Sequence, residues 1–249
     1  LKMIKNKIER FLLQFPIFYR CILRCKLNRN PDKYIFSKYI HKNNTVFDIG
    51  ANIGLYTNFF RELVGKNGFV HSFEPIPKTF KKLESNTKQY SPVKNYRLNM
   101  SGVHDKEANS IAFIPDEISG HASLANHAET WKSNSVQEVT VALSTLDQYF
   151  EKNKLSSVDF IKIDIEGAEI NALEGAKQIL QLYKPILCIE VNSELLKCFQ
   201  KTPFELIKFL KSLSYKNFHY YDEIPWNLKD FENLGNSSSK INTNIIATS

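Results

Sequence analysis

Several residues between positions 48 and 74 have the types and the spacing of a nucleoside-binding turn. An acid ends a short apolar run, and a turn with two glycines four positions apart follows it: Asp48, Gly50, Asn52 and Gly54. Twenty positions beyond Gly54, Glu74 ends a second apolar run. Glycines let a ligand approach the backbone at the beginning of a helix, and an acid after the next strand accepts hydrogen bonds from ribose hydroxyls. The pattern therefore predicts a site for an adenosine-containing ligand.

Asn52 stands where a dinucleotide-binding turn has its middle glycine. A pyrophosphate needs close backbone approach at that position, so the side chain disfavours NAD. A ligand with a ribose and an amino-acid end, but without phosphate, tolerates the side chain. We therefore expect S-adenosylmethionine as the cofactor.

Other polar residues are expected at the same edge of the sheet, because open parallel sheets bind ligands beyond the carboxyl ends of their strands. The acidic and amide side chains at those ends are Asp48, Glu74, Asn99, Asp164 and Glu190. Lys162 would point to the same side of its strand as Asp164, and a buried ammonium needs a partner. We expect a structural ion pair between Lys162 and Asp48 in preference to a catalytic lysine.

The elements that position these residues alternate between strands and helices. Seven strands are expected at residues 45–49, 69–73, 93–98, 158–164, 185–191, 217–221 and 244–247. Helices are expected at residues 32–41, 55–64, 77–90, 166–183 and 203–212, with a further short helix capped by Thr145. This order indicates a doubly wound α/β fold whose last two strands form an antiparallel edge.

Two more strand-like runs, 111–114 and 136–143, precede the fourth strand. We interpret them as an inserted β-hairpin with residues 116–135 as its loop. Loops of that length are usually functional or disordered. Together with residues 222–242, this loop is expected on the acceptor side of the site. His121 in the first loop could act as a base, although a solvated loop histidine is the simpler interpretation.

Basic residues concentrate at the N-terminus. The net charge is +7, but residues 1–42 alone carry +9 and the other 207 residues carry −2. We therefore expect a basic helical extension over residues 1–42 and a nearly neutral domain over residues 43–249, with no strong nucleic-acid signal. Residues 4–27 are amphipathic and could contact an anionic membrane surface. Packing on the domain or on a partner subunit is the simpler interpretation.

The four cysteines, Cys21, Cys25, Cys188 and Cys198, do not form a disulfide framework or a zinc-site spacing. No apolar run reaches the ~18 residues typical of a membrane span. We expect reduced thiols and a cytoplasmic protein that could associate peripherally with the inner membrane surface.

Four motifs resemble the FkbM family of S-adenosylmethionine-dependent methyltransferases: residues 48–57 (DIGANIGLYT), 73–75 (FEP), 145–147 (TLD) and 161–169 (IKIDIEGAE). The resemblance covers about residues 45–192, and its last motif is far more specific than a lone glycine turn. It implies a class I methyltransferase, with a Rossmann-like, seven-stranded, mostly parallel sheet. It also implies methylation of a hydroxyl oxygen, often on sugars or polyketide-derived products.

The resemblance assigns cofactor contacts residue by residue. The methionine end would be surrounded by Gly50, Asn52, Gly54 and Thr57. Asp48 would lie near the ammonium or order the loop, and Glu74 would hold the ribose. Asn99 and Ser101 would border the adenine.

Asp164 would lie near the transferred methyl group, where a carboxylate can orient the acceptor hydroxyl or accept its proton. Glu166 could assist, or could simply favour the positive end of the following helix. A divalent metal is not expected; a minority hypothesis places one on Asp164, Glu190 and Asn192.

The sequence thus favours an O-methyltransferase for a carbohydrate, or for a glycosylated or polyketide-like small molecule. Two other functions stay open. One is an RNA-directed methyltransferase that uses the basic N-terminus. The other is a non-catalytic, membrane-associated scaffold that binds S-adenosylmethionine.

Overall fold

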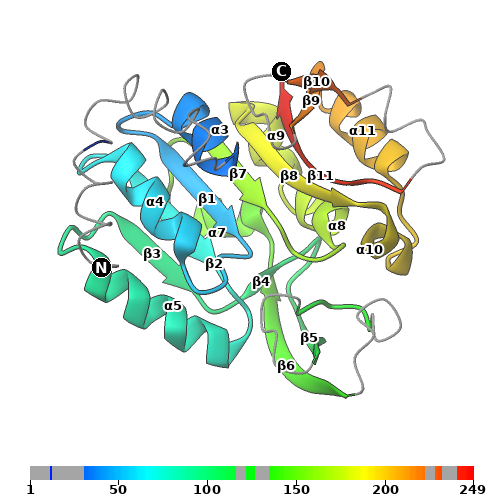
Figure 1. The fold of residues 1–249 in the computed structure, drawn as a ribbon, viewed down its shortest axis with the longest axis horizontal. Coiled ribbons are helices and arrows are strands. Elements are labelled where there is room, and N and C mark those ends of the chain that lie inside the picture. The colour runs from blue at the N-terminus through cyan, green and yellow to red at the C-terminus, as the bar shows by residue number, and fades with distance from the viewer. Residues whose placement is uncertain (1–11, 13–30, 116–121, 127–134, 222–227, 232–239) are drawn as a thin grey trace.

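A twisted central sheet with helices on both faces carries the predicted site (Figure 1). The computed structural model describes residues 12, 31–115, 122–126, 135–221, 228–231 and 240–249. The strands of the sheet, in spatial order, are β10 (Lys229–Asp230), β9 (Asn217–Tyr221), β11 (Asn242–Thr248), β8 (Ile186–Asn192), β7 (Phe160–Ile163), β1 (Thr45–Ile49), β2 (Phe69–Phe73) and β3 (Tyr96–Asn99).

Five neighbouring strands of this sheet, from β3 through β2, β1 and β7 to β8, run parallel. β11 is antiparallel to both β8 and β9, which is the antiparallel edge expected from the end of the chain. The doubly wound α/β prediction is therefore confirmed. The two-residue β10 adds an eighth strand to the seven that were expected.

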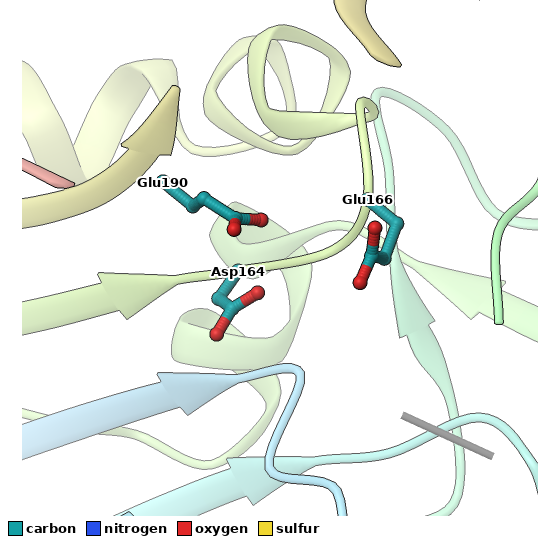
Figure 2. A group of neighbouring side chains, drawn as sticks. All are labelled: Asp164, Glu166 and Glu190. Carbon is teal, nitrogen blue, oxygen red and sulfur yellow. The ribbon is translucent and has the colours of Figure 1, made fainter. Parts of the chain in front are cut away.

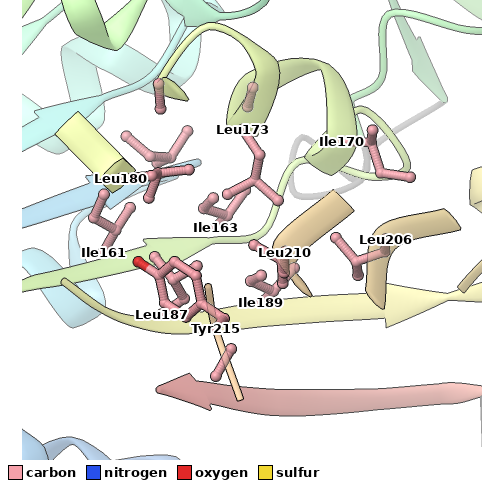
Figure 3. Packing of buried hydrophobic residues seen from close by; sticks show 14 of the residues in the cluster. Ile161, Ile163, Ile170, Leu173, Leu180, Leu187, Ile189, Leu206, Leu210 and Tyr215 are labelled. Carbon is pink, nitrogen blue, oxygen red and sulfur yellow. The ribbon is translucent and has the colours of Figure 1, made fainter. Parts of the chain in front are cut away.

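Alternation along the strands divides the core between the two faces of the sheet. On one face, Ile161, Ile163 and their neighbours pack under four helices (Figure 3). These helices are α7 (Leu146–Lys152), α8 (Glu169–Glu174), α9 (Lys177–Tyr183) and α11 (Pro203–Ser212). On the other face, Val46, Val70 and Phe160 pack against the first helices of the chain. These are α3 (Pro31–Tyr39) and α4 (Leu55–Val64), with α5 (Pro77–Tyr90) beside α4.

Leu12 is the one described residue before Pro31, and it packs against the core cluster that contains Phe36 and Phe60. Packing of residues 4–27 on the domain or on a partner subunit stays a prediction. The membrane alternative for residues 4–27 stays a prediction. Among the described residues, no helix has the length and apolar character that crossing a membrane requires.

The predicted hairpin is present as a separate small sheet. β5 (Ala108–Pro115) pairs antiparallel with β6 (Val136–Ser144), and β4 (Gly102–Val103) adds a parallel strand on the other side of β6. The loop between β5 and β6 folds back at Ser123, whose backbone pairs with that of Phe113. The inserted sheet lies beside the carboxyl edge of the main sheet (Figure 1).

The expected helix 166–183 is wrong in its extent, because the chain forms two helices, α8 and α9, instead. Glu166 and Gly167 have φ values of 56° and 105°, and a helix cannot begin with residues in that region. α8 ends at Gly175, where the carbonyl oxygen of His104 approaches so closely that a Cβ would lie 2.0 Å from it. A short helix, α10 (Ser193–Cys198), was not expected.

Cys188 is buried and Cys198 is exposed, and both are free thiols, as expected. Cys21 and Cys25 lie outside the described residues.

Candidate active site

A cavity of about 280 Å³ lies where β1, β2 and β7 end. The carboxyl ends of adjacent parallel strands meet there, which is where an open sheet binds its ligands. Six of the predicted site residues are on its wall: Gly50, Asn52, Glu74, Ser101, Asp164 and Glu166. The rest of the wall is mostly apolar and includes Leu55, Tyr56, Ile76, Leu124 and Ile165.

The turn after β1 forms the floor of the cavity. Gly50 has a φ of +77°, and a Cβ there would lie 1.9 Å from the carbonyl oxygen of Asp164. The amides of Gly50 and Ala51 donate to the carbonyl of Phe73 at 3.1 and 3.0 Å. Asn52 takes a left-handed φ of 48°, which asparagine adopts more readily than most residues. Only glycine at position 50 allows β7 to end directly against this turn.

Glu74 ties the turn to the end of β2. One carboxylate oxygen accepts the amide of Asn52 at 3.0 Å, and the other accepts the amide of Ile76 at 2.9 Å. The side chain is 6% exposed. Burial raises the pKa of Glu74 to about 7, against the two amide hydrogen bonds that lower it. The residue predicted to hold a ribose therefore also shapes the turn.

Asp48 lies beneath the cavity rather than on its wall. It is fully buried, and its Oδ2 accepts a hydrogen bond of 2.6 Å from the Thr57 hydroxyl. Its Oδ1 lies 3.9 Å from the Lys162 ammonium. Burial raises the pKa of Asp48, and Lys162 opposes that rise. This arrangement favours the loop-ordering role over contact with a ligand.

Gly54, Thr57 and Asn99 also lie off the cavity wall. Gly54 begins α4 with a φ of +88°, and a Cβ there would lie 2.7 Å from the Leu83 side chain. Asn99 donates to the Ser72 carbonyl at 3.1 Å and to the Tyr149 hydroxyl at 3.3 Å. Their expected contacts with the cofactor stay predictions, and the geometry places all three behind the wall.

Lys162 forms the expected ion pair with Asp48 and a shorter one with Asp164. Its ammonium lies 3.0 Å from Asp164 Oδ2 and 5.4 Å from the ring centre of Tyr56. Burial alone would lower the pKa of Lys162, but the two carboxylates outweigh it and raise the pKa. The ammonium therefore stays charged and holds Asp164 at the edge of the cavity.

Three carboxyl groups converge at the end of β7 and β8 (Figure 2). One oxygen from each of Asp164, Glu166 and Glu190 lies within 4.8 Å of the others. The Asp164 side chain is 40% exposed, whereas one oxygen of Glu190 is buried. The amide oxygen of Asn192 is turned away from them, because it caps α10 by accepting from the amides of Glu194 and Leu195.

The loop after β7 holds Glu166 in place through its neighbour Glu169. Glu169 Oε1 accepts the amides of Gly167 and Ile165 at 3.0 and 3.3 Å. Burial raises the pKa of Glu169 to about 7, in opposition to these hydrogen bonds. Glu169 is therefore structural, and Glu166 alone of the two reaches the cavity wall.

Two wall residues were not foreseen. Ser123 donates to the carbonyl of Glu166 at 2.9 Å and so joins the hairpin loop to the loop after β7. Tyr56 hydrogen-bonds through its hydroxyl to Asp32 of α3. Asp32 in turn accepts from the Tyr221 hydroxyl at 3.1 Å and the Asn244 amide at 3.5 Å. Tyr56 stands inside the motif at residues 48–57, but the local sequence has no signal for its partner 24 positions earlier.

His121 lies outside the described residues. The three positions that follow it, 122–124, line the cavity. Its suggested role as a base stays a prediction.

Comparison with known proteins agrees with this geometry. Residues 48–217 match the family model described as the methyltransferase FkbM domain. The chain belongs to the FkbM methyltransferase family. This FkbM-family chain is therefore an S-adenosylmethionine-dependent methyltransferase, as its motifs predicted.

Two curated relatives and one solved structure illustrate the family. Hexuronic acid methyltransferase AglP of Haloferax volcanii is 25% identical over 141 residues, which cover 56% of this chain and 53% of that protein. The 31-O-demethyl-FK506 methyltransferase FkbM of Streptomyces tacrolimicus is 24% identical over 192 residues, which cover 68% of each chain.

The crystal structure of Methyltransferase FkbM from Methylobacillus flagellatus KT superimposes with a TM-score of 0.53 at 15% identity. The superposition covers 99% of this chain and 60% of that one. It supports the class I methyltransferase fold for the FkbM-family chain. The chain spans about half of the length of the archaeal enzyme.

Proposed function

We propose that this protein is an O-methyltransferase for a hydroxyl of a carbohydrate, or of a glycosylated or polyketide-like small molecule. The observation that carries the proposal is the position of Asp164. Its backbone lies directly against the turn at Gly50, and its carboxylate is held at the cavity edge by Lys162. A hydroxyl between Asp164 and the cofactor turn would be both oriented and close to a proton acceptor.

The residues around the turn suit S-adenosylmethionine. The cofactor supplies an electrophilic methyl group when bound. Glu74 offers a carboxylate to ribose hydroxyls, while Gly50 and Asn52 leave the backbone open to an amino-acid end. Ser101 and Gly102 with Ile76 form the part of the wall proposed for the adenine. The cavity is near the lower end of the roughly 300–1,000 Å³ usual for small-molecule sites.

Asp164 would orient the acceptor oxygen for in-line attack and take up the hydroxyl proton as the oxygen–methyl bond forms and the sulfur–methyl bond breaks, with S-adenosylhomocysteine as the leaving group. Glu166 lies beside it and could hold a second hydroxyl of the acceptor. The names of the relatives support this acceptor class, since one is a hexuronic acid methyltransferase and another acts on 31-O-demethyl-FK506. The converging carboxyl groups disfavour a polyanion such as RNA on electrostatic grounds.

A labelled-methyl screen tests the proposal. The full chain would be incubated with labelled S-adenosylmethionine and with panels of neutral sugars, uronic acids, amino sugars, macrolides and RNA. Transfer to a hydroxyl, stable to base and mapped by mass spectrometry, supports the proposal. Transfer to nitrogen or to RNA contradicts it. Binding of S-adenosylhomocysteine with no transfer to any panel would favour the scaffold alternative.

A further inference from the structure

Glu190 lies beside Asp164 because of the strand register, although 26 residues separate them in the chain. β7 and β8 are parallel neighbours, and Ile163 pairs with Ile189. Each of these residues is followed by an acid, so Asp164, directly after β7, and Glu190, within β8, lie at the same level of the sheet. Figure 2 shows the Glu190 side chain directed toward Asp164 and Glu166.

One carboxyl oxygen of Glu190 and one of Asp164 lie within 4.8 Å of each other. Two charged carboxylates this close repel each other and have no donor between them, so a single proton would remove the repulsion and allow a hydrogen bond. The question is which of the two acids holds it.

The surroundings assign the proton to Glu190. Asp164 is 40% exposed and lies 3.0 Å from the Lys162 ammonium, and both conditions favour its charged form. Three neighbouring charged groups act on Glu190, namely Asp164, Glu166 and Glu169, and all three are acidic. Across β11, its partner is the uncharged Asn244.

Two further observations agree with a neutral Glu190. Its Oε2 is buried without a hydrogen-bond partner among the described residues, which costs much less for a neutral acid than for a carboxylate. Burial, followed by the three neighbouring acids, raises the pKa of Glu190 to about 9.

We propose that Glu190 is a neutral carboxylic acid that donates a hydrogen bond to Asp164 and is a positioning residue for the methyl transfer. This inference rests on the function proposed above. Asp164 would be held from two sides, by the ammonium of Lys162 and by the acid of Glu190. A carboxylate has about four acceptor positions, so others remain for the acceptor hydroxyl. Because both partners stabilise the negative charge, they keep Asp164 in its charged, proton-accepting form and in one orientation.

The test compares Glu190→Gln, which keeps a neutral donor of the same shape, with Glu190→Leu, which has no donor. Glu151→Gln on the exposed surface of α7 serves as the control. We expect Glu190→Gln to keep kcat within about threefold of the wild type. We expect Glu190→Leu to lose roughly tenfold or more in kcat, with an unchanged Kd for S-adenosylhomocysteine. In the background of Asp164→Asn, Glu190→Leu should have little further effect.

Two outcomes would overturn the proposal. One is an equal loss of activity in Glu190→Gln and Glu190→Leu while both fold and bind S-adenosylhomocysteine normally. The other is wild-type activity that EDTA removes and Mg²⁺ restores, together with loss in Glu190→Gln. Either would mean that Glu190 works as a carboxylate, in the second case as a cation ligand.

An infrared measurement separates this proposal from the proposed function, because it needs no acceptor. The neutral carboxylic acid C=O band at pH 7 should be larger in the wild type than in Glu190→Gln by one residue. Glu151→Gln should leave the band unchanged. Absence of that difference would contradict a protonated Glu190 even if hydroxyl methylation is observed. Presence of the difference without hydroxyl methylation would contradict only the proposed function.

Discussion

The two halves of the cavity hold their carboxyl groups in opposite ways. In the half formed by β1 and β2, Asp48 and Glu74 are buried, and hydroxyl or amide donors bind them within the protein. In the half formed by the end of β7, Asp164 and Glu166 lie on the cavity wall and converge with Glu190 of the neighbouring strand β8 (Figure 2). The first half is preorganised for one ligand. The second has carboxyl groups in reach of a variable partner, as expected where the acceptor binds.

Replacement of Asp164 by asparagine should have the largest effect, and it should change catalysis without changing cofactor binding. Asp164→Asn removes the proton acceptor but keeps the size of the side chain. We expect kcat to fall roughly 10²–10⁴-fold, the usual range for general acid–base groups. The Kd of S-adenosylhomocysteine, measured by calorimetry, should change less than threefold. Turnover at the wild-type rate would remove Asp164 from the mechanism, and Glu151→Gln is the control for loss of a surface charge.

Replacement of Glu74 by glutamine should have the reverse pattern. We expect Glu74→Gln to weaken binding of S-adenosylhomocysteine by about 10- to 100-fold, since hydrogen bonds to a charged group contribute about 1.5–3 kcal/mol. At saturating cofactor, kcat should fall much less. Calorimetry and steady-state kinetics check both quantities. If Glu74→Gln binds S-adenosylhomocysteine normally but has no activity, Glu74 does not belong to a half of the cavity that serves cofactor binding.

Gly50→Ala should disturb both halves, because Gly50 lies against the backbone of Asp164. The left-handed φ of 77° alone should lower the free energy of unfolding by about 1–3 kcal/mol in the variant. Cofactor affinity and kcat should fall together. Urea unfolding measures the stability. An alanine variant with wild-type stability and kinetics would show that the contact between the two halves is not as close as described.

The acidity of Glu74 predicts the smallest effect. Its pKa is near 4.5 when unfolded and about 7 when folded, so between these values the folded state binds more protons. Stability should therefore fall as pH rises from about 4.5 to 7 and not change further above 7 from this group. The raised pKa of Glu169 makes stability depend on pH in the same range. The test therefore compares the free energy of unfolding of the wild type with that of Glu74→Gln at each pH.

We expect that difference to change by about 1 kcal/mol per pH unit within the range, in the protein without cofactor. Parallel pH profiles of the two proteins in urea unfolding would contradict it. Addition of S-adenosylhomocysteine should reduce the wild-type slope, because ribose hydroxyls favour the ionised carboxylate.

The sequence predicted the half of the site formed by β1 and β2 better than the half after β7. The bounds of β1, α4, β2 and α5 agree with the expected ones, because local signals define them, such as the turn at residues 65–68 and Pro77 at the first helical position. Glu74 was found in the same way, by its distance from a glycine turn. These residues act within one βαβ unit.

The acceptor half depends on contacts that no local pattern contains. Glu166 and Gly167 take left-handed conformations that split the expected helix, and the positive φ at Glu166 is unusual for that residue type. The approach of Glu190 to Asp164 follows from pairing of β7 with β8. Asn99, whose predicted contact with the adenine is untested, hydrogen-bonds to Tyr149, a residue 50 positions away. By contrast, Asn192 was a recognisable helix cap, and α10 could have been predicted from it.

Asp32 joins the first turn of α3 to two other parts of the fold. Its side chain hydrogen-bonds to Tyr56 on the cavity wall and accepts from Tyr221 of β9 and Asn244 of β11. It also borders a small cavity together with Lys162 and Asp164. The beginning of α3 is therefore held close to the end of β7, on the side of the molecule where the acceptor is proposed to enter.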